Sequence, residues 1–441
     1  MGNHDTIAAI STALGHSGIA VVRISGPDAV FVARHLLKRQ EFPEAGRMYL
    51  TSLLDSDGTV IDRVLAVRFA APKSYTREDI VEVHTHGGSL IARTCLELAV
   101  RNGARLAEPG EFTRRAFVNG RIDLAQAEGV LGVIQARTNE ALHAAARTLT
   151  GELSRRVQEL HDDVLALQGS LEVQLDFPEG ESIGVNIGAG LRRLVNELSE
   201  LEAKCRAGLL LREGVRVVIA GRPNAGKSSL MNALLGRNRA IVTDIPGTTR
   251  DTLEEGLIIG GVPVRLVDTA GLREAGDAVE AEGVRRALEA VSEGDVCLYV
   301  VDASRELDAE DKEYMARLAG RKAMAVLNKS DLAGTVDEDE ISLPKVHVSA
   351  KNHTGLDDLK SCVYDLACSE SVLSEGLNVS VSQLEDIRDA REAVSDALVS
   401  QSEDITAGLL GSARMSLLRV LGVDAPDELL DSMFSRFCVG K

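Results

Sequence analysis

The chain has 441 residues, which is too long for a single hydrophobic core and predicts two or three domains. Its formal net charge of -18 and its 3% of aromatic residues argue against holding RNA or a membrane surface by overall attraction. No run of 18 apolar residues and no secretory signal is visible, and the six cysteines form no CxxC pair. These features predict a cytoplasmic protein with reduced thiols and no membrane partner.

The first part of the chain, residues 1–118, is predicted to be a mixed α/β domain. Apolar alternation favours strands at 18–26, 64–70 and 79–86, and three- and four-residue spacing favours a helix at 88–103. Cys95 falls on the apolar face of that helix, so it is interpreted as a core residue.

The pattern then becomes helical, and residues 119–212 are predicted to be the first part of a helical domain. Apolar residues recur every three or four positions from Leu149 to Leu171 and predict one long amphipathic helix, which Pro178 should end. A second helix is expected from Leu191 to Cys205.

Helical spacing returns after residue 368. Residues 369–441 are therefore predicted to be the second part of the helical domain, with a C-terminal CVGK tail. The last helix is expected to use Asp424 as a cap, with Pro426 in its first turn. The intervening residues 213–368 alternate between strand and helix patterns, which predicts an α/β domain inserted into the helical one.

The inserted domain begins with a phosphate-binding motif. GRPNAGKS (221–228) fits G-x-x-x-x-G-K-[ST] between a predicted strand and a predicted helix, the context that the motif requires. Backbone N–H groups of such a loop cradle phosphates at the helix N-terminus. Lys227 is expected to reach the β- and γ-phosphates, and Ser228 to bind Mg²⁺.

Four further segments complete a guanine-nucleotide site. DTAG (268–271) places Asp268 near the metal and the Gly271 N–H near the γ-phosphate, and PGTTRD (246–251) offers a second hydroxyl for Mg²⁺. NKSD (328–331) supplies a carboxylate that can accept from both the ring N–H and the exocyclic amine of guanine. SAK (349–351) adds a backbone contact to the guanine oxygen. Together these predict a Ras-like P-loop GTPase domain.

The residue that orients the attacking water is missing from its usual place. Ras-like enzymes carry Gln shortly after the DTAG glycine, whereas Leu272 follows it here. Glu280 is a candidate replacement, although a solvated helix face is the more ordinary role for a glutamate. Charge stabilisation could come from Arg250, from Arg273, or from a monovalent cation bound partly by the Asn224 side-chain carbonyl.

Long segments outside the GTPase motifs carry a family resemblance. DTIAAISTALGHSGIAVVRISG, YTREDIVEVHTHGG, NGRIDLAQAEGV, DFPEG and FCVGK, with the motifs above, resemble the MnmE (TrmE) family of tRNA modification GTPases over essentially the whole chain. The resemblance implies a homodimer that joins an FAD-containing MnmG (GidA) partner in a heterotetramer or larger complex. It implies that the pair adds a carboxymethylaminomethyl-type group to C5 of the wobble uridine of certain tRNAs. A 5-formyl- or methylene-tetrahydrofolate would supply the one-carbon unit, and K⁺ would stimulate GTP hydrolysis.

The resemblance also implies roles for particular residues. It assigns K⁺ to Asn224, Thr243, Ile245 and Thr248, Mg²⁺ to Ser228 and Thr249, and water activation to Glu280. Motifs and resemblance together assign the GTP contacts to Asn224, Ala225, Gly226, Lys227, Ser228 and Ser229, to Thr243, Asp244, Ile245, Pro246, Gly247, Thr248 and Thr249, to Asp268, Thr269, Ala270 and Gly271, and to Asn328, Lys329, Asp331, Ser349 and Ala350.

The implied folate site consists of Arg23, Glu82, Arg121 and Lys441. A pterin presents adjacent N–H donors that the Glu82 carboxylate can accept, and the arginines can hold the folate carboxylates. Arg121 stands where the family usually has Lys, which keeps the charge and changes the geometry.

Cys438 in the tail has several interpretations. CVGK is a poor prenylation box, and a core cysteine at a helix end is a second possibility. The resemblance implies that Cys438 is needed for tRNA modification, whether it attacks the uridine, acts as an acid or base, or plays another part. The rival functions are a ribosome-assembly GTPase and a membrane-associated GTPase, and the acidic charge and the lack of a basic amphipathic helix argue against them.

Overall fold

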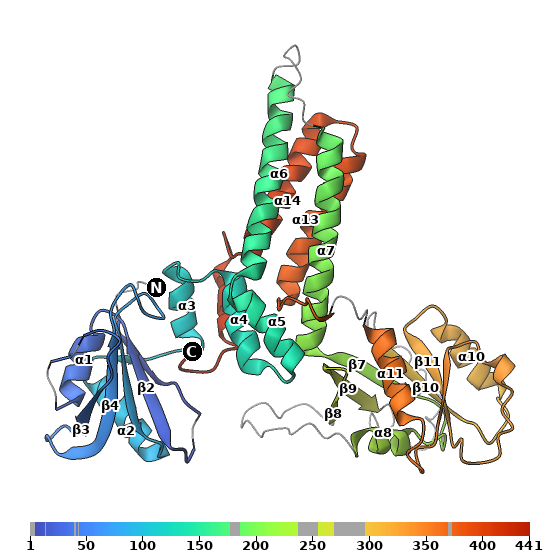
Figure 1. Cartoon of the computed structure of the whole chain (residues 1–441), viewed down its shortest axis with the longest axis horizontal. Coiled ribbons are helices and arrows are strands. Elements are labelled where there is room, and N and C mark those ends of the chain that lie inside the picture. Colours follow the sequence, from blue (N-terminus) through green and yellow to red (C-terminus); the bar gives the residue numbers. More distant parts are fainter. Residues whose placement is uncertain are drawn as a thin grey trace. The chain divides into compact units, whose positions relative to one another are not determined.

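The computed structural model describes residues 5–13, 15–38, 41–42, 44–176, 186–236, 255–268, 296–368 and 373–441. The chain divides into two compact units, each described here by itself (Figure 1). The first comprises Met1–Ala127, Ser154–His161 and Met415–Lys441, and the second comprises Glu128–Leu153 and Asp162–Arg414. The boundaries between the four segments predicted from the sequence stay predictions.

The first unit contains a six-stranded sheet in the order β3-β4-β5-β2-β1-β6. The predicted strands are confirmed as β2, β4 and β5, and the predicted helix as α2, whereas β1, β3 and the helix α1 were not foreseen. The bounds are Ile7–Ile10 (β1), Ile19–Ser25 (β2), Ala29–Leu36 (α1), Tyr49–Leu54 (β3), Val60–Phe69 (β4), Ile80–His86 (β5), Ser89–Arg101 (α2) and Arg105–Leu106 (β6).

The two faces of this sheet have different roles. Val22 and Ile24 on β2, and Val83 on β5, are fully buried in a core that includes residues of α1 and α2, Cys95 among them. Because side chains alternate along a strand, the residues between these positions point to the opposite face. Arg23 and Glu82 are such residues, and the antiparallel register of β2 and β5 places them directly opposite each other.

The first unit also contains two short helices and the C-terminal tail. The helix α3 (Glu111–Val118) contacts α15 (Asp427–Phe434) through an ion pair of 3.0 Å between Arg114 and Asp431. The expectation for the start of α15 was wrong, because Pro426 occupies the N-cap position and no side chain caps the helix. Pro426 has no N–H to leave unpaired at this end, so the helix can begin after it.

The second unit contains most of the helical bundle, in which α6, α7, α13 and α14 run alongside one another (Figure 1). Their bounds, with those of the shorter helices before them, are Leu124–Gln135 (α4), Asn139–Leu149 (α5), Glu152–Asp176 (α6), Ile187–Glu213 (α7), Val381–Val399 (α13) and Glu403–Val420 (α14). The long helix expected from Leu149 is in fact interrupted. Gly151 adopts φ +85°, a left-handed conformation that ends α5, so Leu149 belongs to the preceding helix.

Glu202 on α7 links two helices of this bundle. Its carboxylate accepts hydrogen bonds of 2.7 Å from Arg206 and from Arg391 of α13. Burial alone would raise the pKa of Glu202, but these arginines outweigh burial and hold the pKa below its usual range. A lowered pKa means that the ionised form stabilises the fold above the unfolded pKa, and that this stabilisation is lost as the pH falls through the folded pKa.

The Glu202→Ala variant is therefore expected to be less stable by about 1.5–3 kcal/mol at pH 7, which lowers the melting temperature by several degrees. Thermal unfolding from pH 7 to pH 4 checks this prediction. The difference in melting temperature between the variant and the wild type should narrow only toward pH 4. Glu200→Ala is the matched control, since Glu200 is exposed on the same helix. Equal melting temperatures for the two variants at pH 7 would contradict the prediction.

The inserted domain has a six-stranded sheet in the order β12-β11-β10-β7-β9-β8, in which only the pairing of β8 with β9 is antiparallel. Alternate strand residues pack on opposite sides: Val217 and Ile219 share a core with α8 and α11, and Val218 and Ala220 share one with α10. The bounds are Val215–Ala220 (β7), Lys227–Leu235 (α8), Glu255–Ile259 (β8), Val262–Asp268 (β9), Val296–Asp302 (β10), Ala309–Leu318 (α10), Ala323–Asn328 (β11), Glu338–Glu340 (η2), Lys345–Val348 (β12) and Leu356–Ala367 (α11).

The chain leaves the helical bundle and re-enters it at neighbouring points. The N–H of Leu377 donates to the carbonyl of Lys204 on α7 at 3.0 Å. The Nη1 atom of Arg212, near the end of α7, donates both to Glu128 of α4 at 3.0 Å and to the carbonyl of Val379 at 3.1 Å. The segment that follows the inserted domain is thus bonded to α7, the helix that precedes that domain.

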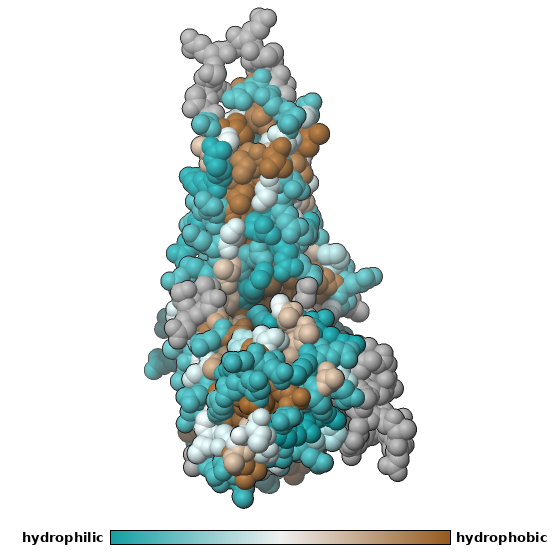
Figure 2. Space-filling view, turned by 90° about the vertical axis from the view of Figure 1, so that its right-hand side faces the viewer, coloured by the Kyte–Doolittle hydropathy of each residue, from teal (hydrophilic) through white to brown (hydrophobic). Residues whose placement is uncertain are grey.

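The surface of the second unit is mostly hydrophilic on the face seen in Figure 2, with a hydrophobic area over the upper part of the bundle. Among the described residues, no helix combines the length and the apolar character needed to cross a membrane.

Candidate functional site

The phosphate loop lies between β7 and α8, as its motif predicts. Asn224 and Gly226 have φ values of +62° and +93°, and left-handed backbone of this kind is tolerated by Asn and Gly. The Lys227 ammonium donates to the carbonyls of Gly221 and Arg222 at 2.7 and 2.8 Å, which holds it across the loop. Ser228 is exposed at the start of α8, where its hydroxyl is accessible to a metal ion.

The NKSD segment (328–331) is bonded directly to the phosphate loop. Asn328, which is 2% exposed at the end of β11, donates through Nδ2 to the carbonyl of Ala225 at 2.9 Å and accepts from the Ala350 N–H at 3.1 Å. It thereby joins the phosphate loop, the NKSD segment and the SAK segment. Gly226 must remain small because a Cβ there would collide with the Asn328 side chain.

Asp331 and Ser349 form a second contact between the NKSD and SAK segments. The Ser349 hydroxyl donates to Asp331 at 2.6 Å, and this hydrogen bond is the main reason that the pKa of Asp331 lies below its usual range. The ionised carboxylate keeps a second oxygen for a ligand. Lys329 has φ +64°, and its ammonium pairs with Asp302 of β10 at 2.6 Å.

Several predicted GTP and metal residues cannot be placed in this way. Thr243, Asp244, Ile245, Pro246, Gly247, Thr248, Thr249, Thr269, Ala270, Gly271 and Glu280 lie outside the described residues, as does the side chain of Asp268 at the end of β9. Their assigned roles stay predictions.

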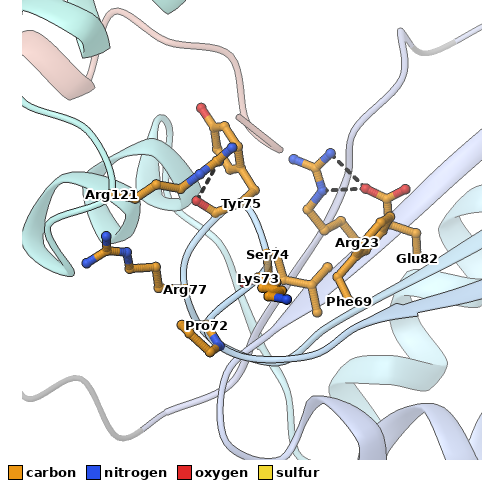
Figure 3. Close-up of a pocket in the computed structure, with 10 residues that line it drawn as sticks. Arg23, Phe69, Pro72, Lys73, Ser74, Tyr75, Arg77, Glu82 and Arg121 are labelled. Atoms are coloured by element: carbon orange, nitrogen blue, oxygen red, sulfur yellow. Dashed lines mark hydrogen bonds and ion pairs between the residues drawn. The ribbon is translucent and has the colours of Figure 1, made fainter. Parts of the chain in front are cut away.

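A cavity of about 560 Å³ opens on the free face of the N-terminal sheet (Figure 3). Its size is that of a small-molecule site. Three of the four predicted folate residues line it: Arg23, Glu82 and Arg121. The remaining lining residues are Phe69, Pro72, Lys73, Ser74, Tyr75, Arg77 and Ile80.

Arg23 and Glu82 form a nearly buried ion pair in this cavity. Both the Nε and Nη2 atoms of Arg23 contact Oε1 of Glu82, at 2.9 and 2.8 Å, and each side chain is 16% exposed. The other oxygen, Oε2, lies 3.3 Å from the His84 ring. Because an ionised carboxylate has about four acceptor positions, Glu82 can still accept from a ligand.

Tyr75 lies between Arg23 and Arg121, the two arginines predicted to bind folate. The guanidinium of Arg121 is 4.9 Å from the centre of its ring, and that of Arg23 is 5.6 Å away. Burial raises the pKa of the Tyr75 phenol, which donates or accepts a hydrogen bond of 2.9 Å with Thr113 of α3. The sequence analysis did not single out Tyr75, although it lies in the YTRED segment that carried the family resemblance.

The predicted tail residues, Cys438 and Lys441, lie beside β1. In the described part of the chain, neither residue lines the cavity. Val439 forms a bridge with Pro109, and the Ser11 hydroxyl donates to the Gly440 carbonyl at 3.1 Å. Cys438 is exposed. Gly440 has φ +97°, and a Cβ there would lie 2.5 Å from the Ile10 carbonyl, so the tail is fixed at the strand end only because this residue is Gly.

The chain matches known proteins over nearly its whole length. Residues 6–121 match the model of the GTP-binding protein TrmE N-terminus, and residues 124–438 match the model of the MnmE helical domain. The chain is similar to the tRNA modification GTPase MnmE of Geobacter sulfurreducens (42% identity), of Heliobacterium modesticaldum (42%) and of Symbiobacterium thermophilum (43%). In each case the alignment covers 99% of both chains.

Proposed function

The chain belongs to the MnmE family of tRNA modification GTPases, and from this premise we propose that it is a K⁺-stimulated GTPase that modifies the wobble uridine of certain tRNAs. It works in the cytoplasm as a homodimer with an FAD-containing MnmG-type partner. Together they add a carboxymethylaminomethyl-type group to C5, using the one-carbon unit of a tetrahydrofolate. The observation that best supports GTP binding is the Asn328 bridge between the phosphate loop and the guanine-recognition segments.

The described residues fit the nucleotide and its metals. Ser228 offers an exposed hydroxyl to Mg²⁺, and Asn224 holds an exposed side-chain amide beside the position of the phosphates. A K⁺ ion bound there supplies positive charge to the transition state, the charge that an arginine supplies in other GTPases. The described residues position the phosphates and the base, and Glu280 is proposed to orient the water.

The cavity fits a tetrahydrofolate. Glu82 can accept adjacent N–H donors of a pterin, and the ion pair with Arg23 orients its carboxylate. The Tyr75 ring gives a flat apolar surface next to this pair. Cys438 is proposed to act on the uridine or the one-carbon unit.

Hydrolysis by the purified protein is expected to be roughly tenfold or more faster in KCl than in NaCl at equal ionic strength. The Asn224→Ala variant should lose this stimulation, because the cation then lacks its ligand from the phosphate loop. Asn232→Ala is the matched control, as Asn232 is exposed on the following helix. Equal rates in the two salts would contradict the proposed use of K⁺.

A further inference from the structure

The cavity of the N-terminal domain carries more positive than negative charge. Four basic side chains line it, Arg23, Lys73, Arg77 and Arg121, and Glu82 is the one acidic lining residue in the described part of the chain. Glu82 is paired with Arg23. Three cations at one cavity therefore have no carboxylate of their own among the lining residues.

The acidic residues nearest to Lys73 and Arg77 in the sequence, Glu78 and Asp79, are engaged with other partners. Glu78 accepts from the Ser25 hydroxyl at 2.7 Å and pairs with Arg115 at 3.2 Å. Asp79 pairs with Arg68 at 3.3 Å and accepts from the Ala71 N–H at 3.1 Å. Both carboxylates thus already have partners outside the set of three cations.

Two of the three cations are held in place through neutral acceptors. Nη1 of Arg77 donates to the carbonyl of Asn119, and Nη1 of Arg121 donates to the carbonyl of Tyr75, each at 2.9 Å. A guanidinium has five N–H donors, so each arginine keeps most of its donors for a ligand while its position is fixed. Lys73 and both arginines are exposed.

The cavity thus has two chemically different ends. Figure 3 shows the Arg23–Glu82 pair on one side, and Arg77 and Arg121 on the other, with the segment that carries Lys73 between them. One end suits a ligand with N–H donors, and the other suits a ligand with several negative charges. A single folate carries two carboxylates, whereas each added γ-linked glutamate contributes one more.

We propose that Lys73, Arg77 and Arg121 bind the carboxylates of a γ-linked oligoglutamate tail, so that this site selects polyglutamylated over monoglutamylated tetrahydrofolate. The proposal rests on the proposed use of a tetrahydrofolate at Glu82. Exposed ion pairs contribute roughly two- to fourfold each, so three of them predict about 10- to 50-fold tighter binding of the longer ligand.

Equilibrium binding of 5-formyl-tetrahydrofolate with one or with five glutamates to the full chain tests the proposal. The wild type should bind the pentaglutamate about 10- to 50-fold more tightly, and added salt should reduce the ratio. In Lys73→Ala/Arg77→Ala the ratio should fall to about threefold or less, while the affinity for the monoglutamate changes little. The control is Arg93→Ala/Arg101→Ala, which removes two exposed charges from α2, the helix on the other face of the sheet from the cavity. This variant should keep the wild-type ratio.

The outcomes separate this inference from the function on which it rests. If both ligands bind the wild type equally, the tail-binding role is wrong and the folate site stands. If neither ligand binds, the proposed folate chemistry itself fails. If the two double variants lose the preference to the same extent, the effect is one of overall charge, which also overturns the proposal.

Discussion

Replacing Asp331 by Asn is expected to lower the affinity for GTP about 100-fold or more, and to raise the affinity for xanthosine triphosphate. In the proposed site the carboxylate accepts from two N–H groups of guanine, and an amide replaces one of its acceptor atoms with a donor. Xanthine has a carbonyl in place of the exocyclic amine, so it matches the Asn amide. Sites built around such hydrogen bonds reject mismatched ligands strongly.

Competition of the two nucleotides for a fluorescent guanine nucleotide measures this change. The Ser349 hydroxyl keeps the pKa of Asp331 below its usual range, so wild-type selectivity should persist down to about pH 5. Asp358→Asn is the control, because Asp358 is exposed at the start of α11 in the same domain. Unchanged selectivity in Asp331→Asn would mean that Asp331 does not contact the base.

Replacing Cys438 by Ser is expected to abolish wobble-uridine modification and to leave GTP hydrolysis unchanged. A hydroxyl is a far weaker nucleophile and acid than a thiol, so either proposed role of Cys438 would be lost. The tail should stay in place, because the bridge at Val439 and the hydrogen bond to Gly440 use backbone atoms of those residues.

Mass spectrometry of tRNA nucleosides from a strain that carries the variant measures the first effect, which should leave less than about 1% of the modified uridine. Hydrolysis by the purified variant in KCl measures the second. Cys362→Ser, in α11 of the GTPase domain, is the matched control for a thiol lost elsewhere. Retained modification in Cys438→Ser would show that the thiol is dispensable.

The sequence predicted where the motif segments lie better than the contacts that join them. The phosphate loop and the NKSD and SAK segments lie where their motifs indicated, because each motif requires a particular strand and helix beside it. The hydrogen bond from Asn328 to Ala225 was not foreseen, since it joins residues that only the order of the parallel strands brings together.

The cavity of the N-terminal domain shows the same limit. Arg23 and Glu82 were each assigned to the folate site, but their ion pair depends on the register of β2 and β5, which no local pattern encodes. The loop with Lys73 and Arg77 has no periodicity, so its place in the cavity wall was not predicted. The long helix expected from Leu149 was wrong because its apolar spacing continues through Gly151, whose left-handed backbone interrupts the helix.

The adjacent connections of the inserted domain affect how the protein is synthesised. The helix α7 leaves the ribosome before residues 213–368, and its bonding partners on α13 leave only after them. At about 5–20 residues per second, this delay is on the order of 10–30 s. During that time α7, whose Leu194, Leu198 and Leu201 are buried in the finished fold, lacks the helix α13 that contacts it. The GTPase domain, whose strands and helices are contiguous in sequence, can fold in this interval, so the helical bundle is completed after that domain has formed.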